Sequence, residues 1–248
     1  MSTPVTAAIL VIGDEILSGR TKDKNIGTIA DVLMAMGIDL REVRIVPDVE
    51  EEIVAAANAL RRRYTYLFTT GGIGPTHDDI TADSIAKAFG VGISERPDAI
   101  AMLLERIKPE DLNEARRRMA RIPDGADLIR NDVSKAPGFM LDNVVVMAGV
   151  PAIMQNMLDN VAPRLAGGTR MVSRSIDAAG LPEGAYAAGL GALAKAHAEV
   201  SIGSYPSFSP DGFRNQIVVR GRDEARVAAA AAAVETLLAD LRGDAVPV

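Results

Sequence analysis

The first 90 residues alternate between two hydrophobic patterns. Short apolar runs predict buried strands, which are expected at residues 7–12, 39–46 and 64–69. Segments in which apolar residues recur every three or four positions predict helices, which are expected to begin near residues 25, 50 and 82. A repeated strand–helix order is typical of a mostly parallel sheet with helices on both faces. We therefore predict an α/β fold with three layers, α/β/α.

The next 80 residues complete this first domain. Residues 97–121 predict a helix broken at Pro109, and the glycine- and proline-containing segment 122–139 predicts a loop. A further strand is expected at 144–147, followed by a helix that begins at Pro151.

The glycine pair at 167–168 marks the expected domain boundary. It predicts two domains, at residues 1–167 and 168–248. The second has the order strand, helix, strand, strand, helix, which indicates a smaller α+β domain. Its elements are expected at 171–176, 183–196, 200–205, 215–220 and 224–241.

Composition then limits the class of protein. The chain has 248 residues, of which 48% are hydrophobic and 4% aromatic, enough for an aliphatic core. Its formal net charge of −6 argues against nucleic acid or an anionic membrane as the main partner. The absence of cysteine excludes disulfides and fits the cytoplasm, and no apolar stretch reaches the length of a membrane span. We expect a cytoplasmic protein with a small-molecule partner.

The segment after the third strand carries the most distinctive chemistry. Residues 69–81 are Thr-Thr-Gly-Gly-Ile-Gly-Pro-Thr-His-Asp-Asp-Ile-Thr. Glycines let the backbone approach a ligand closely, and amides at a helix start favour an anion such as phosphate. The alternative is an ordinary strand–turn–helix junction in which Asp78 caps the helix. Capping alone requires neither three glycines nor a second aspartate, so we favour a phosphate site.

Acidic residues follow each of the first three predicted strands. Asp14 and Glu15 follow the first, Asp48 the second, and Asp78 and Asp79 the third. Ligands of parallel α/β sheets bind at the carboxyl ends of the strands, so these acids are expected to converge at the ligand site. Carboxylates repel a phosphate unless a cation lies between them, so they predict Mg²⁺ or a similar divalent metal.

Two other features allow both a structural and a functional interpretation. His77 is a candidate general base, although a histidine in a turn is more often a surface residue. A basic group before residue 122 is interpreted as a solvated face, with phosphate contact as the alternative. It comprises Arg116, Arg117, Arg118 and Arg121.

A series of short motifs runs in a fixed order over about residues 5–166. They are 13–19 (Gly-Asp-Glu-Ile-Leu-Ser-Gly), Asp23, Asn25, Pro47-Asp48, 69–81, Asn131, 136–139 (Ala-Pro-Gly-Phe) and 149–151 (Gly-Val-Pro). This series resembles the molybdopterin-binding (MoCF biosynthesis) domain family, and within it the amino-terminal part of the competence/damage-inducible protein CinA. The second domain resembles the small KH-like domain of CinA-type chains, with Gly203-Ser204-Tyr205-Pro206 as its landmark.

The resemblance implies a domain that binds a pterin or nucleotide phosphate at the glycine turn. CinA-type members are associated with metal-dependent cleavage of the ADP-ribose pyrophosphate, which implies a pyrophosphatase with Asp48 and Asp79 as catalytic residues. The alternatives are a non-catalytic pterin- or nucleotide-binding module and a molybdopterin adenylyltransferase-like protein of molybdenum cofactor biosynthesis. The implied metal ligands are Asp14, Asp48, Asp78 and Asp79. The implied ligand-binding residues are Gly71, Gly72, Gly74, Thr76, Asn131 and Gly138.

Three positions depart from the family pattern. Ser134 stands where the family usually has glycine, Ile153 replaces a common glutamate, and Ala148 occupies a usual proline position. The changes at 134 and 153 favour binding over catalysis. The identity of the ligand and the role of the second domain stay open, whereas the apolar helices of that domain favour a homo-oligomer.

Overall fold

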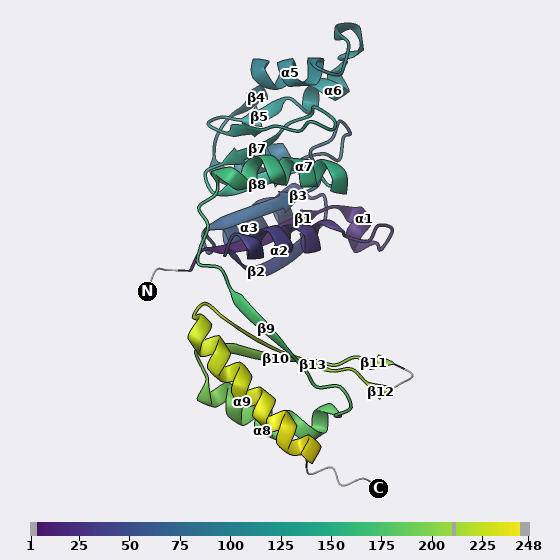
Figure 1. Cartoon of the computed structure of the whole chain (residues 1–248). Helices are drawn as coiled ribbons and strands as arrows, with labels where there is room; N and C mark the ends of the chain where they lie inside the picture. The colour runs from purple at the N-terminus through teal and green to yellow at the C-terminus, as the bar shows by residue number, and fades with distance from the viewer. Residues whose placement is uncertain (1–3, 210–211, 244–248) are drawn as a thin grey trace. The chain divides into compact units, whose positions relative to one another are not determined.

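The computed structural model describes residues 4–209 and 212–243. The chain divides into two compact units, with the division between Gly168 and Thr169 (Figure 1). None of the helices that the structure describes is both long enough and apolar enough to cross a membrane.

The first unit alternates strands with helices along the chain. Its strands are β1 (Thr6–Ile12), β2 (Asp39–Val46), β3 (Tyr66–Thr70), β4 (Ile93–Glu95), β5 (Arg121–Pro123), β6 (Asp127–Ile129), β7 (Gly138–Leu141) and β8 (Val144–Met147). Its helices are α1 (Asp14–Leu17), α2 (Asn25–Ala35), α3 (Glu50–Arg61), α4 (Thr81–Phe89), α5 (Pro97–Leu104), α6 (Glu114–Arg118) and α7 (Pro151–Val161), with 3₁₀ turns at Pro109–Asp111 and Ala162–Arg164.

The central sheet has the strand order β2-β1-β3-β8-β7-β6. The first four strands are parallel, whereas β7 and β6 run antiparallel to their neighbours. Helices connect the parallel strands, as expected for crossovers that return the chain to the same edge. The predicted mostly parallel α/β sheet is confirmed.

β1 shows why the fold has three layers. Its residues are buried on both sides and alternate between two cores: Ala8, Leu10 and Ile12 face one, whereas Ala7, Ile9 and Val11 face the other. The first core is closed by α3, α4 and α5, and the second by α2 and α7 (Figure 1). A continuous apolar run is required for a strand that is covered in this way.

The segment after α5 differs in part from the sequence prediction. The helical region 97–121 is broken near Pro109 as expected, but its second half holds only the short α6. The loop predicted at 122–139 is wrong, because β5, β6 and the start of β7 lie there or at its margin. Strands of three residues are too short to give a periodic pattern, so the sequence carries no signal for them.

The second unit is a smaller α+β structure. Its elements are β9 (Val172–Asp177), α8 (Glu183–Ala196), β10 (Ser201–Tyr205), β11 (Phe208–Ser209), β12 (Gly212–Phe213), β13 (Gln216–Gly221) and α9 (Glu224–Gly243). β10, β13 and β9 form an antiparallel sheet in that order. α9 packs against β9 and β13, and α8 against β10 and α9, so that Ile176, Ile217 and Val219 of the sheet share one core with both helices. The likeness to a KH-like domain stays a prediction.

Candidate functional site

The glycine turn after β3 lies at the point in the sheet where the strand order reverses. β2 lies on one side of β1 and β3 on the other, so the carboxyl ends of β1 and β3 flank a topological switch point. A Cβ added to Gly71 would lie 2.1 Å from the Ile12 carbonyl oxygen, and the φ of Gly71 is 101°. Only glycine allows the two strand ends to approach this closely.

Thr81, the first residue of α4, fixes the orientation of this turn. Its buried hydroxyl donates to the Gly71 carbonyl at 3.0 Å, and its amide donates to the Gly72 carbonyl at 2.9 Å. The N–H and C=O of a trans peptide point in opposite directions, so the amides of Gly72 and Ile73 point away from Thr81. Within residues 4–209 and 212–243, the amides of Gly72, Ile73 and Gly74 donate to no protein group. Three neighbouring donors are left for a ligand or for solvent.

A cavity of about 540 Å³ opens at these residues, and we call it the turn cavity. Its polar lining includes Glu15, Thr21 and Asp79 beside the glycine turn. The rest of the lining is largely apolar and includes Pro75, Met119, Ala136, Val150, Ile153 and Met157. This volume lies within the range of small-molecule sites.

Asp79 is oriented by the turn that precedes it. One of its carboxylate oxygens, Oδ2, accepts from the Thr76 amide at 2.8 Å and also from the Thr76 hydroxyl. Thr76 itself is exposed and does not line the turn cavity, whereas Asp79 does. Thr76 therefore positions Asp79.

A second hollow, which we call the acidic hollow, gathers Asp14, Glu15, Asp48 and Asp78 from the ends of three strands. The Asp14 amide donates to Asp48 Oδ2 at 3.0 Å. Burial raises the pKa of Asp48 above its ordinary value, and the negative charges of Asp14, Glu15 and Asp78 raise it further, while the bond from the Asp14 amide opposes them. Ionisation of Asp48 therefore destabilises the folded protein.

The four aspartates predicted to hold a metal are not brought to a single point. Asp79 does not line the acidic hollow. In the described part of the chain, no three histidine or acidic side chains are arranged so that they could hold a metal ion. Asp14, Asp48, Asp78 and Asp79 therefore do not form a preformed metal centre. A divalent metal stays a prediction, which a metal titration would test.

Asn131 shapes the loop between β6 and β7 from within. Its fully buried side chain donates to Ser134 Oγ at 2.6 Å and to the Ala136 carbonyl at 3.0 Å, and it accepts from the Val133 amide at 3.0 Å. Gly138 lies in β7, where a Cβ would come within 2.5 Å of a carbonyl oxygen of β8. Neither Asn131 nor Gly138 lines the turn cavity. Their role in the structure is to set the course of the loop.

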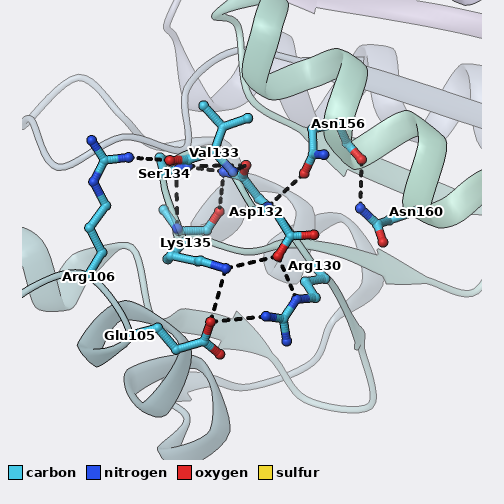
Figure 2. Close-up of polar contacts among 11 residues, drawn as sticks. Glu105, Arg106, Arg130, Asp132, Val133, Ser134, Lys135, Asn156 and Asn160 are labelled. Atoms are coloured by element: carbon cyan, nitrogen blue, oxygen red, sulfur yellow. Dashed lines mark hydrogen bonds and ion pairs between the residues drawn. The ribbon is translucent and has the colours of Figure 1, made fainter.

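The outer side of this loop is tied to the end of α5 by charges (Figure 2). Arg130 donates to Glu105 at 3.0 Å and to Asp132 at 2.8 Å, and Lys135 pairs with the same two carboxylates at 3.1 and 2.9 Å. Lys135 has a φ of 65°, a left-handed conformation that costs a non-glycine residue about 1–2 kcal/mol. The network holds this strained residue in place at the rim of the turn cavity.

The three departures from the family pattern lie together in space. Ser134, Ala148 and Ile153 all line the turn cavity. The left-handed residue of the loop is Lys135, so Ser134 does not need the conformational freedom of glycine. With Ile153 in the lining, that part of the wall is apolar where the family pattern would place an acid.

Three further residues complete the comparison with the sequence prediction. The His77 side chain is 99% exposed and its Nδ1 lies 4.0 Å from Asp78 Oδ1, which favours the surface interpretation. Glu15 was expected among the acids at the strand ends but not among the metal ligands or binding residues, and it lines both the turn cavity and the acidic hollow. The only sequence signal for this role is its place directly after β1. Thr81 was also missed, although it ends the glycine motif.

Comparisons with known proteins agree with this architecture. A family model described as "Probable molybdopterin binding domain" matches residues 8–167, and this chain belongs to that family. A second model, described as the middle domain of FAD synthase, matches residues 170–243. The predicted family resemblance is confirmed.

This chain matches different shares of the length of its individual relatives. A protein of Archaeoglobus fulgidus is 32% identical over 94% of this chain and 98% of its own. A CinA-like protein of Desulfosudis oleivorans is 39% identical over 75% of this chain, which spans only 49% of that relative. The crystal structure of the protein CinA, of unknown function, from Thermoplasma acidophilum has a TM-score of 0.62 at 31% identity, over 65% of this chain and 99% of that one.

The glycines of the turn are expected to differ sharply in their tolerance of substitution. Gly71→Ala places a Cβ against the backbone of β1 in a left-handed conformation, so we expect it to lower the free energy of unfolding by roughly 2–5 kcal/mol. Gly74→Ala is the matched control, because its Cβ would meet only the movable carboxylate of Asp79. Urea denaturation of both variants measures the difference. Equal stabilities would contradict the close approach of the turn to β1.

Asp48→Asn is expected to stabilise the protein at pH 7 in metal-free buffer. Because the folded-state pKa of Asp48 is raised, the cost of ionising it develops as the pH rises from the unfolded-state to the folded-state pKa, and is absent at lower pH. Solvent screens this partly exposed group, so we expect a gain of at most about 1 kcal/mol.

Thermal unfolding at pH 7 and at acid pH tests this expectation for Asp48. Asp98→Asn is a control of opposite sign, because a hydrogen bond from Arg96 lowers the pKa of Asp98. A lower melting temperature for Asp48→Asn than for the parent at pH 7 would contradict the assignment.

Proposed function

We propose that this chain binds a phosphate-bearing pterin or nucleotide in the turn cavity. The observation that carries the proposal is the set of three backbone amides, at Gly72, Ile73 and Gly74, which have no acceptor among the described residues and lie at a cavity of about 540 Å³. Backbone amides of this kind are a common means of holding phosphate oxygens. Membership of the molybdopterin-binding family supports the same conclusion.

The remainder of the turn cavity favours a ligand with a flat, largely apolar ring. Val150, Ile153 and Met157 contribute apolar surface, and Ser134 and Thr21 contribute hydroxyl groups. A ring buried against such side chains gains roughly 25 cal/mol for each Å² of apolar surface removed from water. The few hydroxyl and carboxylate groups of the lining would select between ligands by hydrogen bonding to the polar edges of the ring.

Metal-dependent cleavage of an ADP-ribose-type pyrophosphate is the second candidate. It is favoured by the acidic hollow, where Asp14, Asp48 and Asp78 lie close to one another. The side chains do not form a preformed metal centre, so we place binding first. AMP release from ADP-ribose with Mg²⁺, Mn²⁺ or Co²⁺ that is lost in Asp79→Ala would establish hydrolysis. Its absence would leave binding alone.

The predictions of a homo-oligomer in the cytoplasm are part of this proposal, and native mass spectrometry of the purified protein tests the first of them. Which pterin or nucleotide is bound is a separate question, because the fold by itself does not select the ligand.

A thermal-shift panel tests the binding function. We expect AMP, ADP-ribose, FMN or a phosphorylated pterin to raise the melting temperature progressively as its concentration rises above Kd. Ile153→Trp is expected to raise Kd by about tenfold or more, because the larger side chain would occupy part of the turn cavity. Ala152→Trp is the matched control, since it adds the same side chain at an exposed position on the same helix.

Two outcomes would contradict ligand binding in the turn cavity. If none of these compounds shifts the melting temperature, or if Ile153→Trp and Ala152→Trp behave alike, the turn cavity is not the binding site.

A further inference from the structure

The four arginines near residue 118 do not share one environment. Arg117 donates to Glu95 at 2.6 Å, and Arg121 donates to Asp83 at 2.5 Å, so both are neutralised by carboxylates. Arg116 donates to the Asp111 carbonyl at 2.6 Å and lines neither hollow. The solvated-face interpretation therefore describes these three arginines well.

Arg118 differs from them in position. It lines a small space of about 20 Å³ together with Gly72, Gly74 and Asp79, and so reaches the same turn that lines the turn cavity. Its Nη2 donates to the Asp79 carbonyl at 3.3 Å, which anchors the guanidinium beside the turn. Arg118 is partly buried, and its Nε is buried without a hydrogen-bond partner.

The donors of Arg118 are mostly unused. A guanidinium carries five N–H groups in a fixed planar arrangement that matches the oxygens of phosphate. Among the residues that the structure describes, Arg118 makes no ion pair, and its one hydrogen bond to protein is the bond to the Asp79 carbonyl. A buried donor without an acceptor is costly, so the protein surroundings do not fully satisfy this guanidinium.

The charges around the turn cavity also distinguish Arg118 from the other cations. Glu15 and Asp79 line it, and both would repel a phosphate. No lysine or arginine belongs to the lining of the turn cavity itself, and Arg121, the other cation of the adjoining small space, is paired with Asp83. Arg118 is therefore the cation at the glycine turn whose charge is free to offset the two carboxylates.

We propose that Arg118 is the side chain that pairs with the phosphate group of the ligand, acting together with the amides of Gly72 to Gly74. This inference rests on the proposed function for the nucleotide or pterin, but it specifies an anion subsite that inorganic pyrophosphate probes alone. The arginine supplies charge and the amides supply fixed donors, so the subsite recognises a phosphoryl oxygen and not the ring.

Calorimetric titration of AMP, adenosine and inorganic pyrophosphate into the full chain tests this assignment. We expect Arg118→Ala to weaken the binding of AMP and of pyrophosphate roughly 10- to 100-fold and to leave the binding of adenosine unchanged. Arg118→Lys should restore part of the loss, because it keeps the charge without the planar fork. Arg116→Ala is the matched control on the same helix and should bind as the parent does. Unchanged melting temperatures would confirm that the variants fold.

The possible results separate the two proposals. If AMP and pyrophosphate bind Arg118→Ala as tightly as the parent, or if adenosine is lost in parallel with AMP, the role of Arg118 is refuted while nucleotide binding stands. If pyrophosphate binds in an Arg118-dependent manner and no nucleotide or pterin binds, the anion subsite stands and the proposed function fails. If the parent binds none of these probes and none of the compounds of the thermal-shift panel, both proposals fail.

Discussion

The pair of hydrogen bonds from Thr81 to the carbonyls of Gly71 and Gly72 is the constraint on which the site depends. These bonds fix two successive peptide planes, and the amides on the far side of those planes have no protein partner among the described residues. Because Thr81 is buried and begins α4, the orientation of the turn is coupled to the packing of that helix on the sheet. The fold therefore holds the donors in place before any ligand arrives, which reduces the entropy lost on binding.

The second organising feature is an imbalance of charge around those donors. Glu15, Asp48 and Asp79 place negative charge at the carboxyl edge of the sheet, and burial together with like charge raises the pKa of Asp48. Opposing positive charge comes from the turn amides and from Arg118, which lines the small space that shares Gly72, Gly74 and Asp79 with the turn cavity. A ligand with an anionic group and an apolar ring would match this polarity at both ends. The same polarity would exclude a ligand whose charge lay along the Ile153 wall, because burying an unpaired charge is costly.

The sequence predicted the features that depend on local pattern. The apolar run of β1 predicted a strand covered on both faces. The glycines after β3 were predicted to let the backbone approach a ligand, whereas the close approach that the structure shows is that of Gly71 to the backbone of β1. The acids were expected at one edge because parallel strands end there, and the structure brings Asp14, Asp48 and Asp78 to one hollow.

Features set by the direction of a side chain could not be predicted. Asp78 and Asp79 are adjacent in sequence, yet only Asp78 lines the acidic hollow, because Thr76 turns Asp79 toward the turn cavity. Asn131 matches a ligand-contacting position of the family but satisfies its own loop, and this is visible only once Ser134 and Ala136 are placed around it. The short strand β5 likewise depends on pairing with β4, from which α5 and α6 separate it along the chain.

The most direct test of the account is an NMR titration of isotope-labelled protein with inorganic pyrophosphate, followed at the backbone amides. The account predicts that the amide protons of Gly72, Ile73 and Gly74 shift downfield together and saturate with one dissociation constant, because they come to donate to the same anion. Unmoved resonances at these three residues, with saturating shifts confined to another part of the chain, would contradict it.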